Sequence, residues 1–406
     1  MNQDINFDRF IALGDSITAG YKDGALVFEG QLSSFPNLLA RQIGCDLKQP
    51  LVPEDSPGIG FFGNSQLILE EQSGQGSSLL GYKERCGDVA LLEHNIYANK
   101  GPFGNLGVPG AKVTTLLYPG YGNREKGEGN YNPFFFRVAK DPATSSVLSD
   151  AMQVSPSFFT LFIGNNDVLA YALSGGTSDS ITPLNGETGT GFEKSLEYIL
   201  NELTSAGAKG VVSNLPALSS LPFFKTIPYN SLLLDTRTAD LLNSKNPGAN
   251  TTYCSGYNTY TVEDKKSGKA RQIDKQELIL LDVLLDANKE VYMKGEKPIP
   301  KRYYLTMEEI ECVNSAIIQF NKVIEKITLE KKLAFVDINC LLQTMKTERI
   351  YNSISRNVHY NTGGVFSLDG LHVNSLGQAI LANEFINSIN TTYGTQIEKV
   401  VLTRFR

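Results

Sequence analysis

The sequence lacks several residue types and patterns that would point to particular classes of protein. Its 406 residues include no Trp, three His and five Cys, and no window of about 18 apolar residues occurs, so a transmembrane helix is not expected. The cysteines are scattered, form no CxxC pair and lie in no cluster with histidines, which argues against a zinc site or a disulfide framework. We therefore expect reduced, mostly buried thiols, and no metal or cofactor is implied.

Basic charge is also scarce. The 37 Lys and Arg residues are outnumbered by 43 Asp and Glu residues, for a net charge of -6. Nucleic-acid binding usually leaves a basic footprint, so a nucleic-acid partner is not expected. The hydrophobic content of 41% is ordinary for a globular protein, and a chain of this length can bury a sizeable core.

Short, wholly apolar runs recur along the chain and are typical of strands buried on both faces of a parallel sheet. Stretches with helical spacing of apolar residues occur at Ser34–Gly44, Glu308–Lys326 and Asn374–Ile389. The alternation of strands and helices predicts a three-layer α/β fold with a parallel sheet. The expected strands are Phe10–Leu13, Phe103–Leu106, Phe158–Ile163, Gly210–Ser213 and Leu333–Asp337.

Two long stretches do not fit this alternation. Residues 50–100 are rich in Gly, Ser and Gln, and residues 223–300 mix Tyr, Asn and charged residues. Loops of such length are usually functional lids or small subdomains. We expect a single domain over residues 1–406, with these two insertions forming a lid or small subdomain.

The first candidate for chemistry follows the first expected strand, at Gly14-Asp15-Ser16. Ligands of open α/β sheets gather at the carboxyl ends of the strands, so Ser16 is delivered to that edge. A serine hydroxyl is a weak nucleophile and needs a base within hydrogen-bonding reach. By itself the tripeptide fits a helix N-cap equally well.

A base is available at only one of the three histidines. His372 follows Asp369 by three residues, and such a carboxylate can orient the imidazole and stabilise its charged form. His94 and His359 have no such companion, so we interpret them as surface or lining residues. Ser16, His372 and Asp369 are thus candidates for nucleophile, base and orienting carboxylate.

Acyl transfer also requires fixed donors for a developing oxyanion. Gly110 follows the second expected strand and can offer a backbone N–H, and Asn165 follows the third and can offer its amide. Alone, either residue is equally typical of a turn. Together with Ser16, His372 and Asp369, they predict a serine hydrolase.

These residues resemble the SGNH (GDSL-type) hydrolases. The resemblance implies a flavodoxin-like α/β/α sandwich with five parallel strands and no cofactor. It also implies Ser16 as nucleophile, His372 as base and Asp369 as third member of a catalytic triad, with an oxyanion hole of the Ser16 and Gly110 N–H groups and the Asn165 side chain. Its blocks appear in order as Gly14-Asp15-Ser16, Gly110, Gly164-Asn165-Asn166-Asp167 and Asp369-Gly370-Leu371-His372.

Further segments look like the large GDSL-type lipase/esterase proteins of Bacteroidetes-like bacteria. Such proteins commonly carry an export or lipoprotein signal, which the first residues of this sequence do not resemble. The resemblance favours the cell envelope or exterior, whereas the sequence as written favours the cytoplasm. The segments are Tyr21–Gly24, Gly30–Gln31, Ser34–Ala40, Gly164–Leu169, Gly363–Gly364 and Phe366–His372.

One position departs from the family pattern. Many members have Pro after the catalytic His, where this chain has Val373-Asn374. We expect Asn374 to cap the final helix instead.

The sequence thus predicts a serine carboxylic-ester hydrolase of the lipase/esterase type, acting through an acyl-enzyme on a small-molecule, lipid or glycan ester. Alternatives are a carbohydrate deacetylase with the same mechanism and an inactive scaffold that binds carbohydrate or lipid. An inactive scaffold is expected to have lost one of the four key side chains, and none is lost. Aromatic residues that could form a binding surface are Tyr118, Tyr121, Tyr131 and Phe134–Phe136.

Overall fold

The computed structural model divides the chain into two compact units. The first comprises Met1–Asp167, Thr182–Ser220 and Ile317–Arg406, and the second Val168–Ile181 and Leu221–Ala316. His359 and Gly363 lie outside the described residues. The described residues are 5–71, 78–127, 129–177, 180–245, 252–264, 267–345, 349–351, 354–356, 360 and 364–405.

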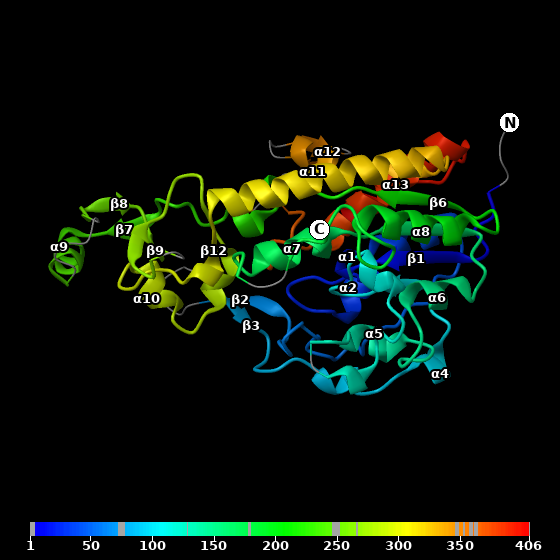
Figure 1. Ribbon diagram of the computed structural model, residues 1–406, viewed down its shortest axis with the longest axis horizontal. Helices are drawn as coiled ribbons and strands as arrows, with labels where there is room; N and C mark the ends of the chain where they lie inside the picture. The colour runs from blue at the N-terminus through cyan, green and yellow to red at the C-terminus, as the bar shows by residue number, and fades with distance from the viewer. Residues whose placement is uncertain are drawn as a thin grey trace. The chain divides into compact units, whose positions relative to one another are not determined.

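A parallel sheet of five strands lies at the centre of the first unit, in the order β13-β6-β5-β1-β4 (Figure 1). All five expected strands are confirmed, although the second begins two residues later than expected. Every residue of β1 and β5 is buried, which explains why these strands read as unbroken apolar runs. The strands are β1 (Phe10–Gly14), β4 (Asn105–Gly107), β5 (Phe158–Phe162), β6 (Lys209–Ser213) and β13 (Ala334–Val336).

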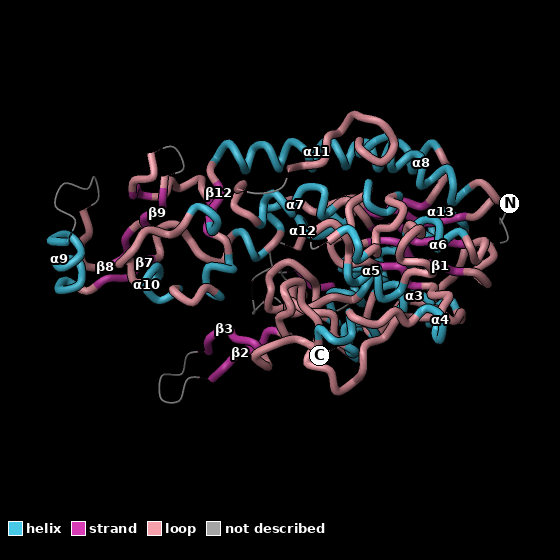
Figure 2. Tube along the Cα trace, turned by 60° about the horizontal axis from the view of Figure 1, so that its bottom comes forward, coloured by secondary structure: helices cyan, strands magenta, loops and turns pink. Residues whose placement is uncertain are grey.

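Helices cover both faces of this sheet (Figure 2). Helices α3 (Phe35–Ile43) and α13 (Ser375–Tyr393) pack against each other. The connections after β4, β5 and β6 contain α6 (Val147–Met152), α8 (Phe192–Thr204) and α11 (Met307–Glu330). Because parallel crossovers are right-handed and the strand order reverses after β4, these helices lie on the face opposite α3. The expected three-layer α/β/α sandwich is confirmed.

Smaller elements complete the first unit. Residues 50–100, the first expected insertion, contain an antiparallel hairpin of β2 (Leu67–Glu71) and β3 (Ser78–Tyr82). A second hairpin pairs β14 (Arg349–Tyr351) with β15 (Ile354–Arg356). The short helices are α1 (Ser16–Ala19), α2 (Phe28–Leu32), α4 (Tyr97–Lys100), α5 (Pro133–Val138) and α12 (Ile338–Thr344), and α7 (Asn165–Leu173) runs from this unit into the second.

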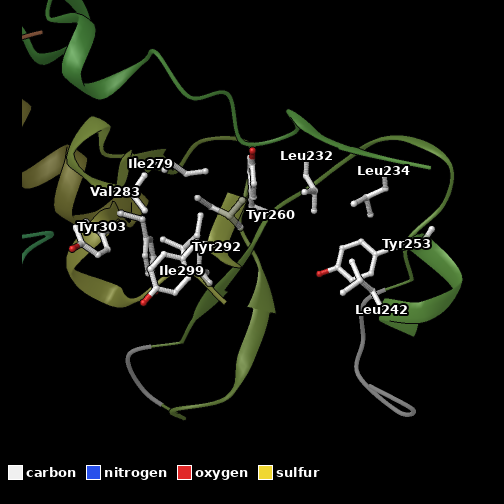
Figure 3. Packing of buried hydrophobic residues seen from close by; sticks show 14 residues of the cluster. Leu232, Leu234, Leu242, Tyr253, Tyr260, Ile279, Val283, Tyr292, Ile299 and Tyr303 are labelled. Atoms are coloured by element: carbon white, nitrogen blue, oxygen red, sulfur yellow. The ribbon is translucent and has the colours of Figure 1, made fainter. Parts of the chain in front are cut away.

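The second unit, which includes residues 223–300, has a core of its own, rich in tyrosine (Figure 3). Tyr303 and Tyr304 are almost fully buried, and the Tyr304 hydroxyl donates to the Glu263 carbonyl at 2.7 Å. Its described part contains small antiparallel pairs, the helices α9 (Thr236–Lys245) and α10 (Lys289–Met293), and parts of α7 and α11. The pairs are β7 (Leu232–Leu234) with β8 (Gly256–Asn258), β9 (Thr261–Glu263) with β10 (Ala270–Gln272), and β11 (Leu278–Ile279) with β12 (Tyr304–Leu305).

The cysteines are all unpaired, but the expectation that most are buried is wrong. Cys45 is half-buried and the other four are exposed. On α11, for example, Val313 takes the buried position and its neighbour Cys312 therefore faces outward. Among the described residues, no helix combines the length and apolar character needed to cross a bilayer.

Candidate active site

The residue that caps α1 is Asp15 rather than Ser16. The Asp15 carboxylate accepts the backbone N–H of Ile17 at 3.0 Å, so Ser16 is the first residue of the helix. The chain must turn sharply here, and a Cβ on Gly14 would collide with the Phe162 carbonyl oxygen of β5 and the Thr18 side chain. This close approach accounts for the glycine that precedes the aspartate.

The structure brings Ser16, His372 and Asp369 into one hydrogen-bonded chain. The Ser16 hydroxyl lies 2.8 Å from Nε2 of His372, and Nδ1 of His372 lies 2.9 Å from Oδ2 of Asp369. The Ser16 residue is 6% exposed, and the His372 and Asp369 side chains are 12% and 10% exposed. Water therefore has limited access to the imidazole.

Asp369 is held in its ionised form. Its Oδ1 accepts the backbone N–H groups of Leu371 and His372 at 2.9 and 2.8 Å, and its Oδ2 also accepts the Gly24 N–H at 2.9 Å. Burial acts to raise the pKa of Asp369, but the charge and hydrogen bonds of His372 and the amide of Leu371 outweigh it and lower the pKa to about 2.

The same carboxylate changes the basicity of His372. Burial acts to lower the pKa of His372, while Asp369 and, at longer range, Asp15 and Asp23 raise it above the ordinary value of 6.5. The net shift is upward. The imidazole is consequently a stronger base than a free histidine and binds a proton readily.

The donors expected for an oxyanion include two backbone N–H groups, of Gly110 and Ser16. The turn that carries Gly110 is tied to β1 by the Val108 N–H, which donates to the Gly14 carbonyl at 2.9 Å. Gly110 has φ +80° and, among the described residues, no acceptor takes its N–H. The Ser16 N–H belongs to the first turn of α1, where no helical acceptor exists.

Asn165 has a partner that the sequence did not reveal. Its Nδ2 donates to Oδ2 of Asp15 at 2.9 Å, which links the end of β5 to the end of β1. Burial raises the pKa of Asp15 from 3.8 to about 6, and the hydrogen bonds from Asn165 and Ile17 oppose that shift. Since an amide nitrogen carries two hydrogens, Asn165 keeps a second donor.

Aromatic rings flank the imidazole. Tyr21 lies 4.8 Å from the His372 ring and 5.5 Å from Phe61, and Phe61 lies 5.5 Å from Phe134, measured between centroids. Phe61 is 46% exposed, and a Cβ on Gly110 would lie 2.9 Å from its ring. Neither Tyr21 nor Phe61 was predicted from the sequence as a site residue. For Phe61 a signal existed, because it is an aromatic residue within the first insertion.

The aromatic surface expected from residues 118–136 is only partly present. Phe134, Phe135 and Tyr121 are all buried: Phe134 packs against Phe61, and Tyr121 stacks on Phe135 with 5.9 Å between the ring centroids. Tyr118 is exposed and carries the Lys126 amino group over its ring at 3.8 Å. His94 is exposed, as interpreted from the sequence.

A hydroxyl, an imidazole and a carboxylate at the carboxyl edge of a parallel α/β/α sheet fit a hydrolase. Residues 10–385 match the model of the GDSL-like Lipase/Acylhydrolase family. The chain belongs to this family and is a carboxylic-ester hydrolase. In the described part of the chain, no three His, Cys, Asp or Glu side chains gather as metal ligands would.

The chain is similar to several solved structures of other proteins. A family 3 carbohydrate esterase from Clostridium thermocellum is 12% identical, with a TM-score of 0.36 over 96% of this chain and 98% of that one. A lipase/acylhydrolase from Enterococcus faecalis is 14% identical, with a TM-score of 0.35 over 97% and 100%. An acetyl xylan esterase variant from Geobacillus stearothermophilus is 12% identical, with a TM-score of 0.33 over 98% and 100%. No curated protein sequence matches the chain.

The bond between Asn165 and Asp15 predicts a stability change that depends on pH. Because the folded-state pKa of Asp15, about 6, exceeds the ordinary 3.8, its burial lowers stability as pH rises through that interval. Asn165→Ala raises this pKa further, so its destabilisation, about 1–3 kcal/mol, should be larger at about pH 8 than at about pH 4. The destabilisation is measured by urea unfolding at both pH values, with circular dichroism as the signal.

Asn166→Ala is the matched control for that experiment. Its amide donates to the Ala111 carbonyl at 3.0 Å, a neutral acceptor, so its loss should be the same at both pH values. Equal destabilisation by Asn165→Ala at both pH values would contradict the coupling to Asp15.

Proposed function

We propose that this esterase acts through a Ser16-His372-Asp369 triad and a covalent acyl-enzyme. The observation that carries the proposal is the continuous hydrogen-bonded chain at 2.8 and 2.9 Å. His372 removes the Ser16 proton as Oγ attacks the ester carbonyl, then returns it to the departing alcohol oxygen. His372 then deprotonates a water that attacks the acyl-enzyme, and it gives that proton to Ser16 Oγ as the acid leaves.

The charge that develops on the carbonyl oxygen is stabilised by fixed donors. The backbone N–H groups of Ser16 and Gly110 and the second N–H of Asn165 supply these donors. Such preorganised donors need no reorientation during the reaction, and one of them contributes about 2.7–4 kcal/mol in other enzymes. Asp369 stays ionised and stabilises the imidazolium while the proton resides on His372.

Ser16→Ala should abolish turnover of a short p-nitrophenyl ester while leaving thermal unfolding unchanged. Removing the nucleophile of a serine hydrolase costs about 10⁶-fold in kcat. A fluorophosphonate probe should label the wild-type protein at Ser16 and leave the variant unlabelled. Ser205→Ala, at the exposed end of α8, is the control and should behave as wild type.

The same labelling separates the enzyme from an inactive scaffold that only binds carbohydrate or lipid. A scaffold without activity takes no label at Ser16 and shows no difference in turnover between wild type and Ser16→Ala. Either result, obtained with a pure preparation, would contradict the triad proposal.

The pH dependence of kcat/KM should report His372. The base must be neutral, so activity falls about tenfold per pH unit on the acid side, and the raised pKa places this limb above pH 6.5. Asp369→Asn removes the charge that raises this pKa, so the limb should move to lower pH and kcat should drop about 10⁴-fold. An acid limb that stays in place would assign the titration to another group, such as Asp15.

The substrate of the proposed triad is a lipid ester or an acetylated glycan. Phe61, which is 46% exposed and packs on the buried rings of Tyr21 and Phe134, offers an apolar face near His372 for an acyl chain. Aromatic faces suit sugar rings equally well, so the deacetylase alternative stays open. The measurement that distinguishes the two alternatives is kcat/KM for p-nitrophenyl esters from acetyl to palmitoyl. An optimum at long chains supports a lipase, and a sharp acetyl preference supports a deacetylase.

A further inference from the structure

A tight turn at residues 22–25, called here the 22–25 turn, follows the nucleophile helix. Lys22 and Ala25 exchange backbone hydrogen bonds at 3.0 Å, and both central residues have positive φ, +51° at Asp23 and +73° at Gly24. An Asp-Gly pair is a preferred sequence for such a turn. The mechanism above makes no use of this turn.

Three residues in succession connect the turn to residues 367–372, the 367–372 loop. The Asp23 N–H donates to the Ser367 hydroxyl at 3.0 Å, and the Leu368 N–H donates to Oδ1 of Asp23 at 2.9 Å. The Gly24 N–H donates to Oδ2 of Asp369 at 2.9 Å. That oxygen also binds Nδ1 of His372, so the turn contacts the triad directly.

The other side of Asp23 is held by the first insertion. Gln66 Nε2 donates to Oδ2 of Asp23 at 3.1 Å, and the Leu67 N–H donates to the Asp23 carbonyl at 2.7 Å. The Lys83 N–H, next to β3, donates to the Gln66 carbonyl at 2.8 Å. The Asp23 carboxylate therefore spans from the insertion, through Oδ2, to the 367–372 loop, through Oδ1.

We propose that Asp23 is a positioning residue, through which the first insertion fixes the 367–372 loop and so sets the place of Asp369 and His372. The inference rests on the proposed triad. It gives Gln66, Leu67 and Lys83 of the first insertion a supporting role in catalysis that needs no contact with substrate. A residue that served only the turn would need positive φ and nothing more, whereas here both carboxylate oxygens are engaged.

Two substitutions separate the carboxylate from the turn. Asp23→Gly keeps the positive φ without strain but removes both acceptors. Asp23→Asn keeps an acceptor for the Leu368 N–H, and the Gln66 amide can rotate to face the new NH₂ group. Asp55 is an exposed aspartate in the first insertion, so Asp55→Asn controls for the loss of one negative charge.

The experiment measures kcat, KM, the rate of fluorophosphonate labelling at Ser16 and amide hydrogen exchange in the 367–372 loop. Asp23→Gly should lower kcat and the labelling rate by about 10- to 100-fold, because a misplacement of about 1 Å costs up to about 100-fold. KM should be little changed and exchange at Leu368 should accelerate. Asp23→Asn should keep kcat and the labelling rate within about threefold of wild type, and Asp55→Asn should show the wild-type values.

Two further variants approach the same contacts from either side. Ser367→Ala removes the acceptor of the Asp23 N–H, and Gln66→Leu removes the donor from the insertion. Each should lower kcat in the same direction as Asp23→Gly, and thermal unfolding confirms that each variant folds. If Asp23→Gly does not fold, these two variants test the positioning role in its place.

The outcomes separate this inference from the proposed function. If wild-type Ser16 takes no label, the triad mechanism fails whatever Asp23 does. If Ser16 is labelled and Asp23→Gly reacts at the wild-type rate, or if Asp23→Asn loses as much as Asp23→Gly, only the positioning role is overturned. Unchanged exchange at Leu368 in Asp23→Gly overturns it as well.

Discussion

The buried carboxylate of Asp15 is the contact on which the geometry of the site depends. It accepts the Ile17 N–H at the start of α1 and the Asn165 amide at the start of α7. Burying a carboxylate is costly unless its oxygens are hydrogen-bonded, so these bonds hold firmly in the ionised state. Together they hold the ends of β1 and β5 in one arrangement beside Ser16.

Strand order explains why part of the site needs a separate support. β1, β4 and β5 are neighbours, so the loops after them meet at one edge through pairing alone. β13, the last strand of this sheet before His372, lies at the far edge of the sheet, three positions from β1. Strand pairing therefore does not bring the 367–372 loop to Ser16. The contacts of Asp23 and Gly24 with that loop supply one such constraint, and Gln378 of α13, whose amide donates to the Ile17 carbonyl at 3.0 Å, supplies another.

The sequence was informative where the physical signal was local. Strands buried on both faces appear as unbroken apolar runs, and Asn374 caps α13 as expected, accepting the Gly377 N–H at 3.0 Å. Asp369 and His372 could be predicted as a pair because they lie only three positions apart in the sequence. The boundary of β4 was less well predicted, since the apolar Phe103 precedes the strand while the polar Asn105 belongs to it.

Other features had no local signal to find. The bond between Asp15 and Asn165 joins residues 150 positions apart, and that between Asp23 and Leu368 joins residues 345 apart. Both aspartates fit an alternative local role, as a helix cap or a turn residue, which hides their long-range contacts. In the second unit the strands are only two or three residues long, too short for any periodicity to show.

The second partner of Asn165 is compatible with its proposed role in the oxyanion hole. An ionised Asp15 can only accept, so the amide must present its nitrogen, and not its oxygen, to that carboxylate. One N–H is used in this bond, and the rotation of the side chain is thereby fixed. The direction of the other N–H is fixed with it, before any substrate arrives. A donor that is already oriented stabilises a developing charge without further reorganisation. The same aspartate that caps the nucleophile helix thus also orients the amide beside the nucleophile.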